Sequence, residues 1–413
     1  MRIRARTAVL TGCAALVLTA CGGGFGSSEE TAQDTSEHQR LRVLIGTSAD
    51  AETEAVKAAA AAWAQRTGNE VTVTVARDLP QQLGQAFAGG TPPDVFYATS
   101  DKFADYAEGG SLHAYGDELA EPEAFSEGLR EAFSRDGELV CAPKDSSTLA
   151  LAINKDLWQE AGLTDADIPR DWAGLERAAG KLTKGEVTGL SFDPTYNRIG
   201  AFLRQSGGWL TDAEQSRMTA DSEENLRALE YVRGLLDKGV LAYPKDIGAG
   251  WGGEAFGKER AAMVIEGNWL LGALEKDFPD VDYRLVELPA GPAGKGTLSF
   301  STCWGVAKKS AHHKAAVDLV ESLTAPGRQL AFADAFGVMP SREDAMARYE
   351  KEYPEQQAFV AGTAYAQGPV TLAGFQKVLG QFDTGLASLE SEDPEEILAA
   401  LQRQGTSAMK SGD

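Results

Sequence analysis

Several short segments of the chain carry aromatic and polar side chains that could hold a hydroxylated ligand. Aromatic rings can stack on the apolar faces of sugar rings, and planar polar groups can bind sugar hydroxyls. The aromatic candidates are Tyr196, Trp209, Trp251, Trp269 and Trp304, although Trp304 could equally pack between strands. The polar candidates are Thr47, Asp101, Lys102, Asp145, Ser147, Asn197 and Glu266. This combination of residue types suits carbohydrate binding.

Catalytic motifs are much less evident. The sequence has neither a G-x-S-x-G nor an H-E-x-x-H motif, and it contains four His. The adjacent pair His312-His313 would point about 100° apart on a helix, and no third ligand is near, so we expect no metal site and no cofactor. A glycoside hydrolase needs only two carboxylates, and the chain has 61 Asp and Glu residues, so a secreted glycan-active enzyme remains an alternative.

The N-terminus has the layout of a bacterial secretory leader. Three Arg residues in the first six positions precede an apolar stretch over 8–18, which is shorter than the roughly 20 residues needed to cross a bilayer. The sequence Leu-Thr-Ala-Cys ending at Cys21 resembles a lipobox and predicts cleavage before Cys21, with lipid attached to its sulfur. An ordinary signal peptide with a chance cysteine is the alternative. Residues 22–40 are rich in Gly, Ser and acids and are expected to form a flexible tether.

Charge and composition narrow the class of protein further. The formal net charge is −22, and removal of residues 1–20 takes away three Arg and no acid, so the charge becomes −25. Such a chain is a poor partner for nucleic acid, and we expect it to contact the membrane only through the lipid on Cys21. With 413 residues, of which 43% are apolar, the chain can bury two cores.

Alternating strands and helices predict a mostly parallel α/β sheet near the N-terminus. Strands are expected at 41–45, 71–75 and 94–97, with helices at 50–67 and around 79–88. Ligands of such sheets lie at the carboxyl ends of the strands, here the loops 46–50 and 98–102. Further on, we expect an exposed polar corner at 144–148 between two extended runs, and a helix capped by Asp221.

Five segments resemble the sugar-type (family 1) extracellular solute-binding proteins of bacterial ABC importers. They are Pro143 to Trp158, Pro169 to Trp172, Trp251 to Trp269, Leu298 to Val306 and Pro340 to Arg342. The resemblance implies an α/β fold of the type II periplasmic-binding-protein-like class, with two discontinuous lobes, a hinge and an interlobe cleft. It also implies that Trp269 lies on a cleft-facing turn, and that a strand at 298–306 and a helix starting at Ser310 return to the first lobe.

The crossovers of the resembled fold set the expected lobe boundaries. Residues 41–142 and 304–340 would form the N-terminal lobe, and residues 143–303 and 341–413 the C-terminal lobe. Asp101-Lys102 stands where maltodextrin-binding relatives carry an acid-base dipeptide, but Ala98 replaces their aromatic residue, which argues against a maltodextrin ligand.

The two cysteines that remain after lipidation are expected to pair. The resembled fold places the hinge strands that carry Cys141 and Cys303 side by side, and export exposes both thiols to oxidation. Two separate buried thiols are the alternative, because cysteine also packs as a small apolar residue.

Together these observations predict a monomeric solute-binding protein, anchored by lipid on the extracellular face of the cell membrane. It would close two lobes over a carbohydrate, expected to be a short oligosaccharide, and deliver it to the transmembrane subunits of an ABC permease without catalysis. Because acids outnumber bases so heavily, a cationic solute such as a polyamine or an amino sugar is the alternative ligand.

Overall fold

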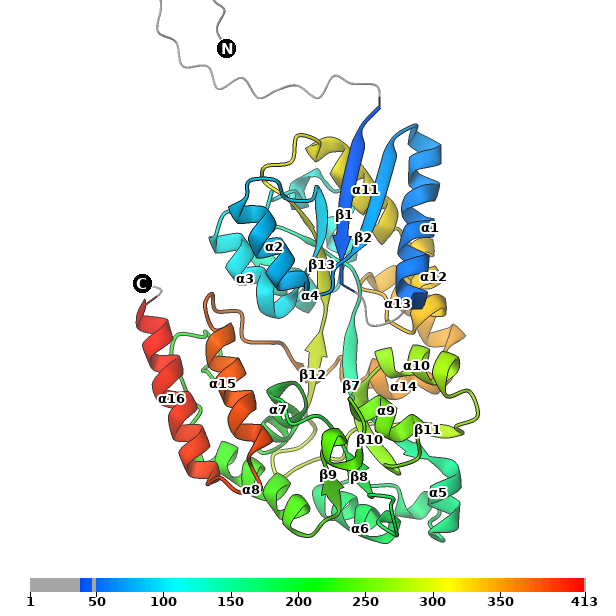
Figure 1. The fold of residues 1–413 in the computed structure, drawn as a ribbon, viewed down its shortest axis with the longest axis vertical. Helices are drawn as coiled ribbons and strands as arrows, with labels where there is room; N and C mark the ends of the chain where they lie inside the picture. The colour runs from blue at the N-terminus through cyan, green and yellow to red at the C-terminus, as the bar shows by residue number, and fades with distance from the viewer. Residues whose placement is uncertain (1–37, 47–49, 412–413) are drawn as a thin grey trace, which may run out of the picture. The chain divides into compact units, whose positions relative to one another are not determined.

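The computed structural model describes residues 38–46 and 50–411, and these residues belong to one compact unit. Within this unit most strands form two separate sheets, each flanked by helices (Figure 1). The chain passes between the sheets three times, so each lobe is assembled from distant stretches of sequence. The predicted fold class, two discontinuous α/β lobes joined by a hinge, is confirmed.

The first lobe is built on a five-stranded sheet. Its strands lie in the order β2 (Glu70–Val75), β1 (Arg40–Ile45), β3 (Val95–Thr99), β13 (Thr302–Val306) and β6 (Ala142–Pro143). β1 pairs in parallel with β2 and β3, as the alternation of strands and helices requires, whereas β13 runs antiparallel to β3 and β6. The carboxyl ends of the parallel strands therefore meet at one edge of the sheet.

Helices cover this sheet, and local sequence explains where they begin. The side chain of Asp78 accepts a hydrogen bond from the backbone N–H of Gln81, and Pro80 occupies the first turn, so α2 begins at Leu79. The helices of this lobe are α1 (Asp50–Thr67), α2 (Leu79–Ala88), α3 (Ser100–Glu108), α4 (Glu127–Ala132), α11 (His313–Thr324) and α12 (Pro326–Phe336). A small hairpin joins β4 (Ser134–Arg135) to β5 (Glu138–Leu139).

The second lobe is built on a seven-stranded mixed sheet. Its strands are β14 (Ala366–Gln367), β12 (Thr297–Phe300), β7 (Ser147–Asn154), β10 (Met263–Gly267), β8 (Leu190–Ser191) and β9 (Leu241–Ala242) in that order, with β11 (Tyr283–Val286) also paired to β7. The long strand β7 is buried along its whole length, which explains its continuous apolar run.

Ten helices of the described chain belong to this second half of the fold. They are α5 (Lys155–Glu160), α6 (Trp172–Leu182), α7 (Tyr196–Gln205), α8 (Glu223–Asp237), α9 (Gly252–Gly257), α10 (Trp269–Asp277), α13 (Glu343–Glu352), α14 (Gln357–Gly362), α15 (Gln376–Ala387) and α16 (Pro394–Ser411). Trp172 is a packing residue, because its ring stacks on Tyr231 with centroids 4.3 Å apart. α15 and α16 pack against each other, and they contact α7 and α8 respectively.

The three passages between the lobes are hydrogen-bonded to one another. The N–H of Lys144, between β6 and β7, donates to the carbonyl of Thr302, the first residue of β13, at 2.7 Å. Ser146 and Met339 exchange backbone hydrogen bonds of 2.8 and 3.1 Å, which attaches the third passage to the first. The hinge is therefore a small braced unit rather than three independent linkers.

The polar corner predicted at 144–148 is not exposed. All five of its residues are buried, and Lys144 is 5% exposed. Partners from distant segments make this possible, because polar groups are buried only where other groups satisfy them. The sequence-based expectation was wrong because these partners lie far away in the chain.

Three element boundaries also differ from the predictions. Ser222, not Asp221, caps α8, because the Ser222 side chain accepts from the N–H of Asn225. The strand expected over 298–306 is two strands that break at Ser301, where the chain changes sheets. The helix expected from Ser310 begins at His313, because the hydroxyl of Ser310 instead donates to Asp94 at 2.6 Å.

Cys141 and Cys303 form a disulfide with their α-carbons 5.6 Å apart. Both cysteines are fully buried among apolar residues of the first lobe, including Phe96 and Phe133. The bond therefore joins the segment that leaves the first lobe, just before β6, to β13, through which the chain returns. Within the described ranges no helix combines the length and apolarity that a membrane span requires.

Candidate functional site

A cleft of about 630 Å³ lies where the two lobes face each other. Its first-lobe wall is formed at the carboxyl ends of the parallel strands, where Gly46 follows β1, Arg77 follows β2 and Thr99 ends β3. Its second-lobe wall comes from the start of α7, the start of α10, strand β12 and the segment 367–369. This is the general position of ligands in open α/β sheets.

The structure brings most of the predicted ligand residues together. Eight of the twelve candidates line the cleft: Asp101, Lys102, Asp145, Ser147, Tyr196, Asn197, Trp209 and Trp269. Thr47 and the lipidation residue Cys21 lie outside the described residues. Trp251 and Glu266 do not line the cleft, and neither does Trp304, which is fully buried against Tyr97 in the first-lobe core.

Trp251 packs within the second lobe. Its ring lies against α9, so close to Gly253 that a Cβ added there would be 2.1 Å from the indole. The same residue packs on the apolar cluster around Phe256 and Leu270. Trp251 therefore contributes to packing. It opens the family-like segment 251–269 because it directly precedes helix α9.

Glu266 lies behind the cleft wall rather than in it. Its side chain has no exposed surface, and one carboxylate oxygen accepts from Arg198 at 2.6 Å and from the indole N–H of Trp269 at 2.9 Å. Burial raises the pKa of Glu266, and the Arg198 guanidinium offsets part of this rise. Glu266 is thus a structural partner of two neighbours, because β10 buries it beneath the turn that carries Trp269.

Trp269 is held in one orientation on several sides. Besides the bond to Glu266, the Arg198 guanidinium lies 5.1 Å from the indole centroid, and Phe300 meets the ring edge to face at 5.3 Å. A Cβ at Gly267 would lie 2.2 Å from the benzo edge of Trp269, so the ring packs directly on the backbone. A half-buried tryptophan fixed in this way is a preformed aromatic platform.

Tyr196, Asn197 and Trp209 supply a second polar and aromatic group near this platform. Tyr196 and Asn197 begin α7, and the N–H of Tyr196 donates to the carboxylate of Asp383 at 2.7 Å. Burial raises the pKa of Asp383 to about 6, although the bond from Tyr196 opposes the shift. Trp209 is 8% exposed and follows the same helix.

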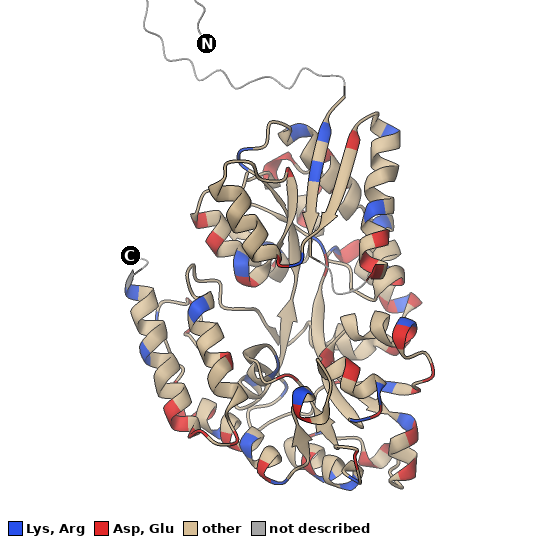
Figure 2. Cartoon of the chain, in the orientation of Figure 1, with Lys and Arg blue, Asp and Glu red and all other residues tan. Residues whose placement is uncertain are grey.

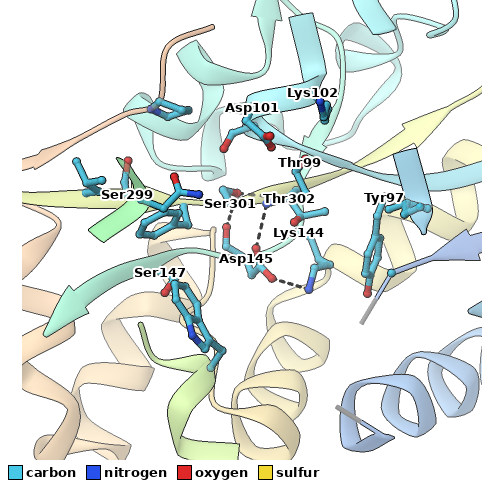
Figure 3. A pocket seen from close by; sticks show the side chains of 18 of the residues that line it. Tyr97, Thr99, Asp101, Lys102, Lys144, Asp145, Ser147, Ser299, Ser301 and Thr302 are labelled. Atoms are coloured by element: carbon cyan, nitrogen blue, oxygen red, sulfur yellow. Dashed lines mark hydrogen bonds and ion pairs between the residues drawn. The ribbon is translucent and has the colours of Figure 1, made fainter. Parts of the chain in front are cut away.

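A buried ion cluster lies at the hinge end of the cleft. The ammonium of Lys144 contacts Asp145 at 2.5 Å and Glu52 of α1 at 2.9 Å, and it lies 4.8 Å from the centroid of Tyr97. Burial disfavours the ammonium, but the two carboxylates outweigh this and raise the pKa of Lys144 well above its usual value. Figure 3 shows Asp145 between Lys144 and the pair Ser301 and Thr302, to which it is also hydrogen-bonded.

Asp101 and Lys102 line the cleft from the first turn of α3. Figure 3 shows both on the opposite side of the pocket from Ser147. Ala98, in contrast, is fully buried in β3 and presents nothing to the cleft. The acid-base dipeptide noted in the sequence is therefore available to a ligand, whereas the position of the missing aromatic residue is filled by core.

Sequence reasoning missed several cleft residues. The structure adds Glu52, Arg77, Tyr97, Tyr106, Lys144, Ser299, Phe300, Ser301, Thr302 and Gln367. The strand carrying Phe300 had been recognised as a hinge strand, so its side chains could have been proposed. Glu52 gave no signal, because it is one acid on a helix and its role depends on Lys144, which is 92 positions away.

The charges in the cleft are balanced. Among the described residues that line it, three are acidic (Glu52, Asp101 and Asp145) and three are basic (Arg77, Lys102 and Lys144). In the part of the chain that the structure describes, no group of three or more His, Cys, Asp or Glu residues could hold a metal ion. The cleft thus offers aromatic faces, hydroxyls, amides and paired charges.

Residues 58–361, more than half of the chain, match the protein family described as bacterial extracellular solute-binding protein. The chain belongs to this family. Its members are extracellular binding proteins, and the fold of this solute-binding protein, with a cleft between two hinged lobes, agrees with that assignment.

One characterised relative is DasA of Streptomyces coelicolor, a diacetylchitobiose binding protein. It is 23% identical over 275 residues, which cover 64% of this chain and 64% of that protein. The similarity therefore spans less than two thirds of the relative's own length.

Two solved structures show how far the fold is shared. An ABC substrate-binding protein from Listeria monocytogenes, in complex with cycloalternan, has a TM-score of 0.82 and 23% identity, covering 90% of this chain and 99% of that chain. UgpB from Mycobacterium tuberculosis, in complex with glycerophosphocholine, has a TM-score of 0.79 and 17% identity, covering 89% and 98%. At these identities the likeness shows the fold, and the cleft residues must decide the ligand.

Proposed function

We propose that this solute-binding protein holds a carbohydrate, a short oligosaccharide, between its lobes and delivers it to the transmembrane subunits of an ABC permease. The observation that carries the proposal is the fixed platform of Trp269, facing a cleft that Tyr196 and Trp209 also line. Sugar rings present apolar C–H faces to aromatic rings and hydroxyls to polar groups, and this cleft offers partners for both. The diacetylchitobiose and cycloalternan of two relatives belong to the same chemical class.

The balanced charge of the cleft favours a neutral ligand over a polyamine. A polycation would require unpaired acids, but Asp145 and Glu52 are already bound to Lys144. Figure 2 shows the acidic residues scattered over the helices of both lobes, so most of the net charge lies on the outer surface. The same pairing speaks against a glycosidase, because two of the three cleft acids are occupied by a cation.

Ligand capture would involve closure of the two lobes about the hinge. The proposed moving bodies comprise residues 41–142 with 304–340 and residues 143–303 with 341–413. The proposed boundaries between residues 142 and 143 and between residues 303 and 304 fall in strands β6 and β13. These two strands are hydrogen-bonded to each other, which supports a compact hinge where the chain passes between the lobes. The tether expected over 22–40 ends earlier than residue 40, because Arg40 already belongs to β1. A monomer lipidated on Cys21 and tethered by the residues that precede the first lobe would present the cleft on the extracellular side of the membrane.

A thermal-shift screen over oligosaccharides and polyamines tests the ligand class. A ligand present at 100 times its dissociation constant stabilises the folded state by about 2.7 kcal/mol, which is readily detected. We expect stabilisation by oligosaccharides and none by spermidine or putrescine. Recovery of the bound sugar unchanged after long incubation would support a binding protein, whereas turnover would show an enzyme.

Membrane fractionation of wild type and Cys21→Ser tests the anchor.

A further inference from the structure

A second cavity of about 740 Å³ adjoins the ligand cleft. It lies between α4 of the first lobe and α13, and it is closed on one side by the segment 366–369. Seven residues line both cavities: Ser100, Ser299, Phe300, Ser301, Gln367, Gly368 and Pro369. The two spaces therefore share a wall and adjoin along β12.

We propose that this second chamber receives the end of an oligosaccharide too long for the first cleft alone. The inference rests on the proposed carbohydrate function and adds the length of the ligand to it. Binding would begin on the aromatic platform at Trp269, and the chain would continue past Phe300 into the chamber.

The lining of the chamber fits sugar hydroxyls. Hydroxyl-bearing residues surround it on both lobes, namely Ser126, Ser146, Thr148, Ser341, Thr363 and Thr371 in addition to the shared serines. Some of these hydroxyls are already used inside the protein, as Thr148 donates to the carbonyl of Phe359 and Ser341 to that of Pro143. The side chains of Ser126 and Ser146 have no hydrogen bond within the described chain and remain available to a ligand.

The chamber differs from the cleft in having one aromatic residue, the shared Phe300, and no cation free to hold an acidic group. Arg342, its one basic residue, is bound to Glu121 at 2.7 Å and to Asp344 at 2.8 Å. Three glutamates, Glu131, Glu343 and Glu350, also line the chamber, and their carboxylates can accept hydrogen bonds from sugar hydroxyls. A sugar end that carries hydroxyls and no negative charge is the ligand that this chemistry suits. Hydrogen bonds that replace water contribute modestly, so we expect the chamber to add about tenfold in affinity.

Position along the wall supports this order of binding. Figure 3 shows Ser299 at the end of the cleft away from Tyr97, and Ser299 also lines the chamber. The hydroxyl of Ser299 donates to the carbonyl of Gln367 at 3.4 Å, so the wall consists of a strand and a loop from the same lobe. A ligand could extend along this wall while its first rings remain on the platform.

One glycine and one alanine can each be replaced by a large side chain that would fill the chamber without changing a residue of the cleft. Gly128 of α4 and Ala347 of α13 are exposed, line only the chamber, and belong to opposite walls, and no atom lies within 4 Å of a Cβ built at Gly128. Gly380 of α15 provides the matched control, because it is equally exposed and open and lines neither cavity.

The experiment measures dissociation constants for chitooligosaccharides, maltooligosaccharides and arabino-oligosaccharides from disaccharide to heptasaccharide. In the wild type, we expect affinity to rise by about tenfold as the chain grows beyond the length that fills the cleft. Gly128→Trp and Ala347→Trp should bind the shorter members like the wild type and lose this rise, and Gly380→Trp should retain it.

Two results would overturn the inference, and they differ from failure of the proposed function. Equal affinity for all chain lengths in the wild type would show that the chamber does not bind the sugar. An unchanged rise of affinity with chain length in both filled variants would show the same, and carbohydrate binding by the cleft would still stand. Binding of no member of any series would remove the carbohydrate function itself, and the chamber with it.

Discussion

The buried carboxylate of Glu266 accepts a hydrogen bond from the indole N–H of Trp269 at 2.9 Å, and the same oxygen accepts from Arg198 at 2.6 Å. Arg198 in turn lies 5.1 Å from the centroid of the Trp269 ring. The three side chains form a closed set in which an acid and a base orient one aromatic residue. The ligand platform is therefore built before any ligand arrives, which lowers the entropic cost of binding.

This arrangement predicts that Glu266 affects affinity only through Trp269. Glu266→Gln keeps an acceptor for the indole but removes the charge that holds Arg198, so affinity for the bound sugar should fall by about 1 kcal/mol. In a Trp269→Ala background the same change should have no further effect on affinity, because the residue it positions is gone. Isothermal titration calorimetry of the four proteins checks this, and additive losses would show that Glu266 acts elsewhere.

Loss of Trp269 itself should weaken binding directly. Trp269→Ala removes an aromatic anchor that is half-buried in the free protein, and we expect a loss of about 1 to 3 kcal/mol in binding free energy with cooperative unfolding retained. Trp251→Ala is the matched control, because this tryptophan lies outside the cleft and its removal should leave affinity unchanged. Non-cooperative unfolding of Trp269→Ala at unchanged affinity would make it a core residue instead.

Closure should depend on hydrogen bonds that cross from α3 to the start of α15 and the segment just before it. The N–H of Gly374 donates to the carboxylate of Asp105 at 2.6 Å, and the Gln376 side chain donates to the carbonyl of Asp101 at 2.5 Å. These bonds join the first lobe to the second across the cleft, so they would help to hold closed lobes together, and Asp105→Ala should speed ligand release by several fold.

Stopped-flow release and small-angle scattering test closure together. Saturating sugar should reduce the radius of gyration of the wild type, and Asp105→Asn, which keeps an acceptor oxygen, should release ligand more slowly than Asp105→Ala. A radius that sugar does not change would count against a closing cleft.

Asp383 should make stability depend on pH in the acidic range. Its pKa is about 6 in the folded protein and about 3.9 in an unfolded chain, so the folded state binds the proton more tightly. This contribution to stability is present below about pH 4 and is lost as pH rises through about 6. Asp383→Asn cannot titrate at this position, so the variant should not lose this contribution as pH rises. The unfolding free energy of the variant minus that of the wild type should therefore increase from pH 4 to pH 7. A difference that is constant with pH would contradict the prediction.

The disulfide should stabilise the fold without affecting ligand affinity. The disulfide lies in the first-lobe core and joins residues separated by 162 positions in the sequence. Replacing both Cys141 and Cys303 by Ala should therefore lower the free energy of unfolding by about 2 to 5 kcal/mol. Neither residue lines the cleft, so sugar affinity should stay the same. Thiol titration of the unfolded, unreduced domain made without Cys21 should find no free thiol, and two free thiols would rule out the bond.

Much of the architecture follows from local sequence. The helices at 50–67 and around 79–88 and the strands near 41–45, 71–75 and 94–97 could be predicted, because hydrophobic periodicity, caps and breakers act over a few residues. The residue types of the cleft, such as Trp269, Tyr196 and Asp101, could also be chosen from the sequence, although Asp101 was expected in a loop and lies in the first turn of α3.

Only the tertiary structure decided which of these residues face the ligand. Glu266 and Trp269 are three residues apart, yet Glu266 lies in β10, which is buried along its whole length, and Trp269 begins α10 at the cleft. Lys144 was expected in a solvated corner, but Glu52 and Tyr97 from the first lobe enclose it. The chamber beside Phe300 is likewise formed by helices more than 200 positions apart. Burial and charge pairing depend on such distant partners, and a local pattern carries no information about them.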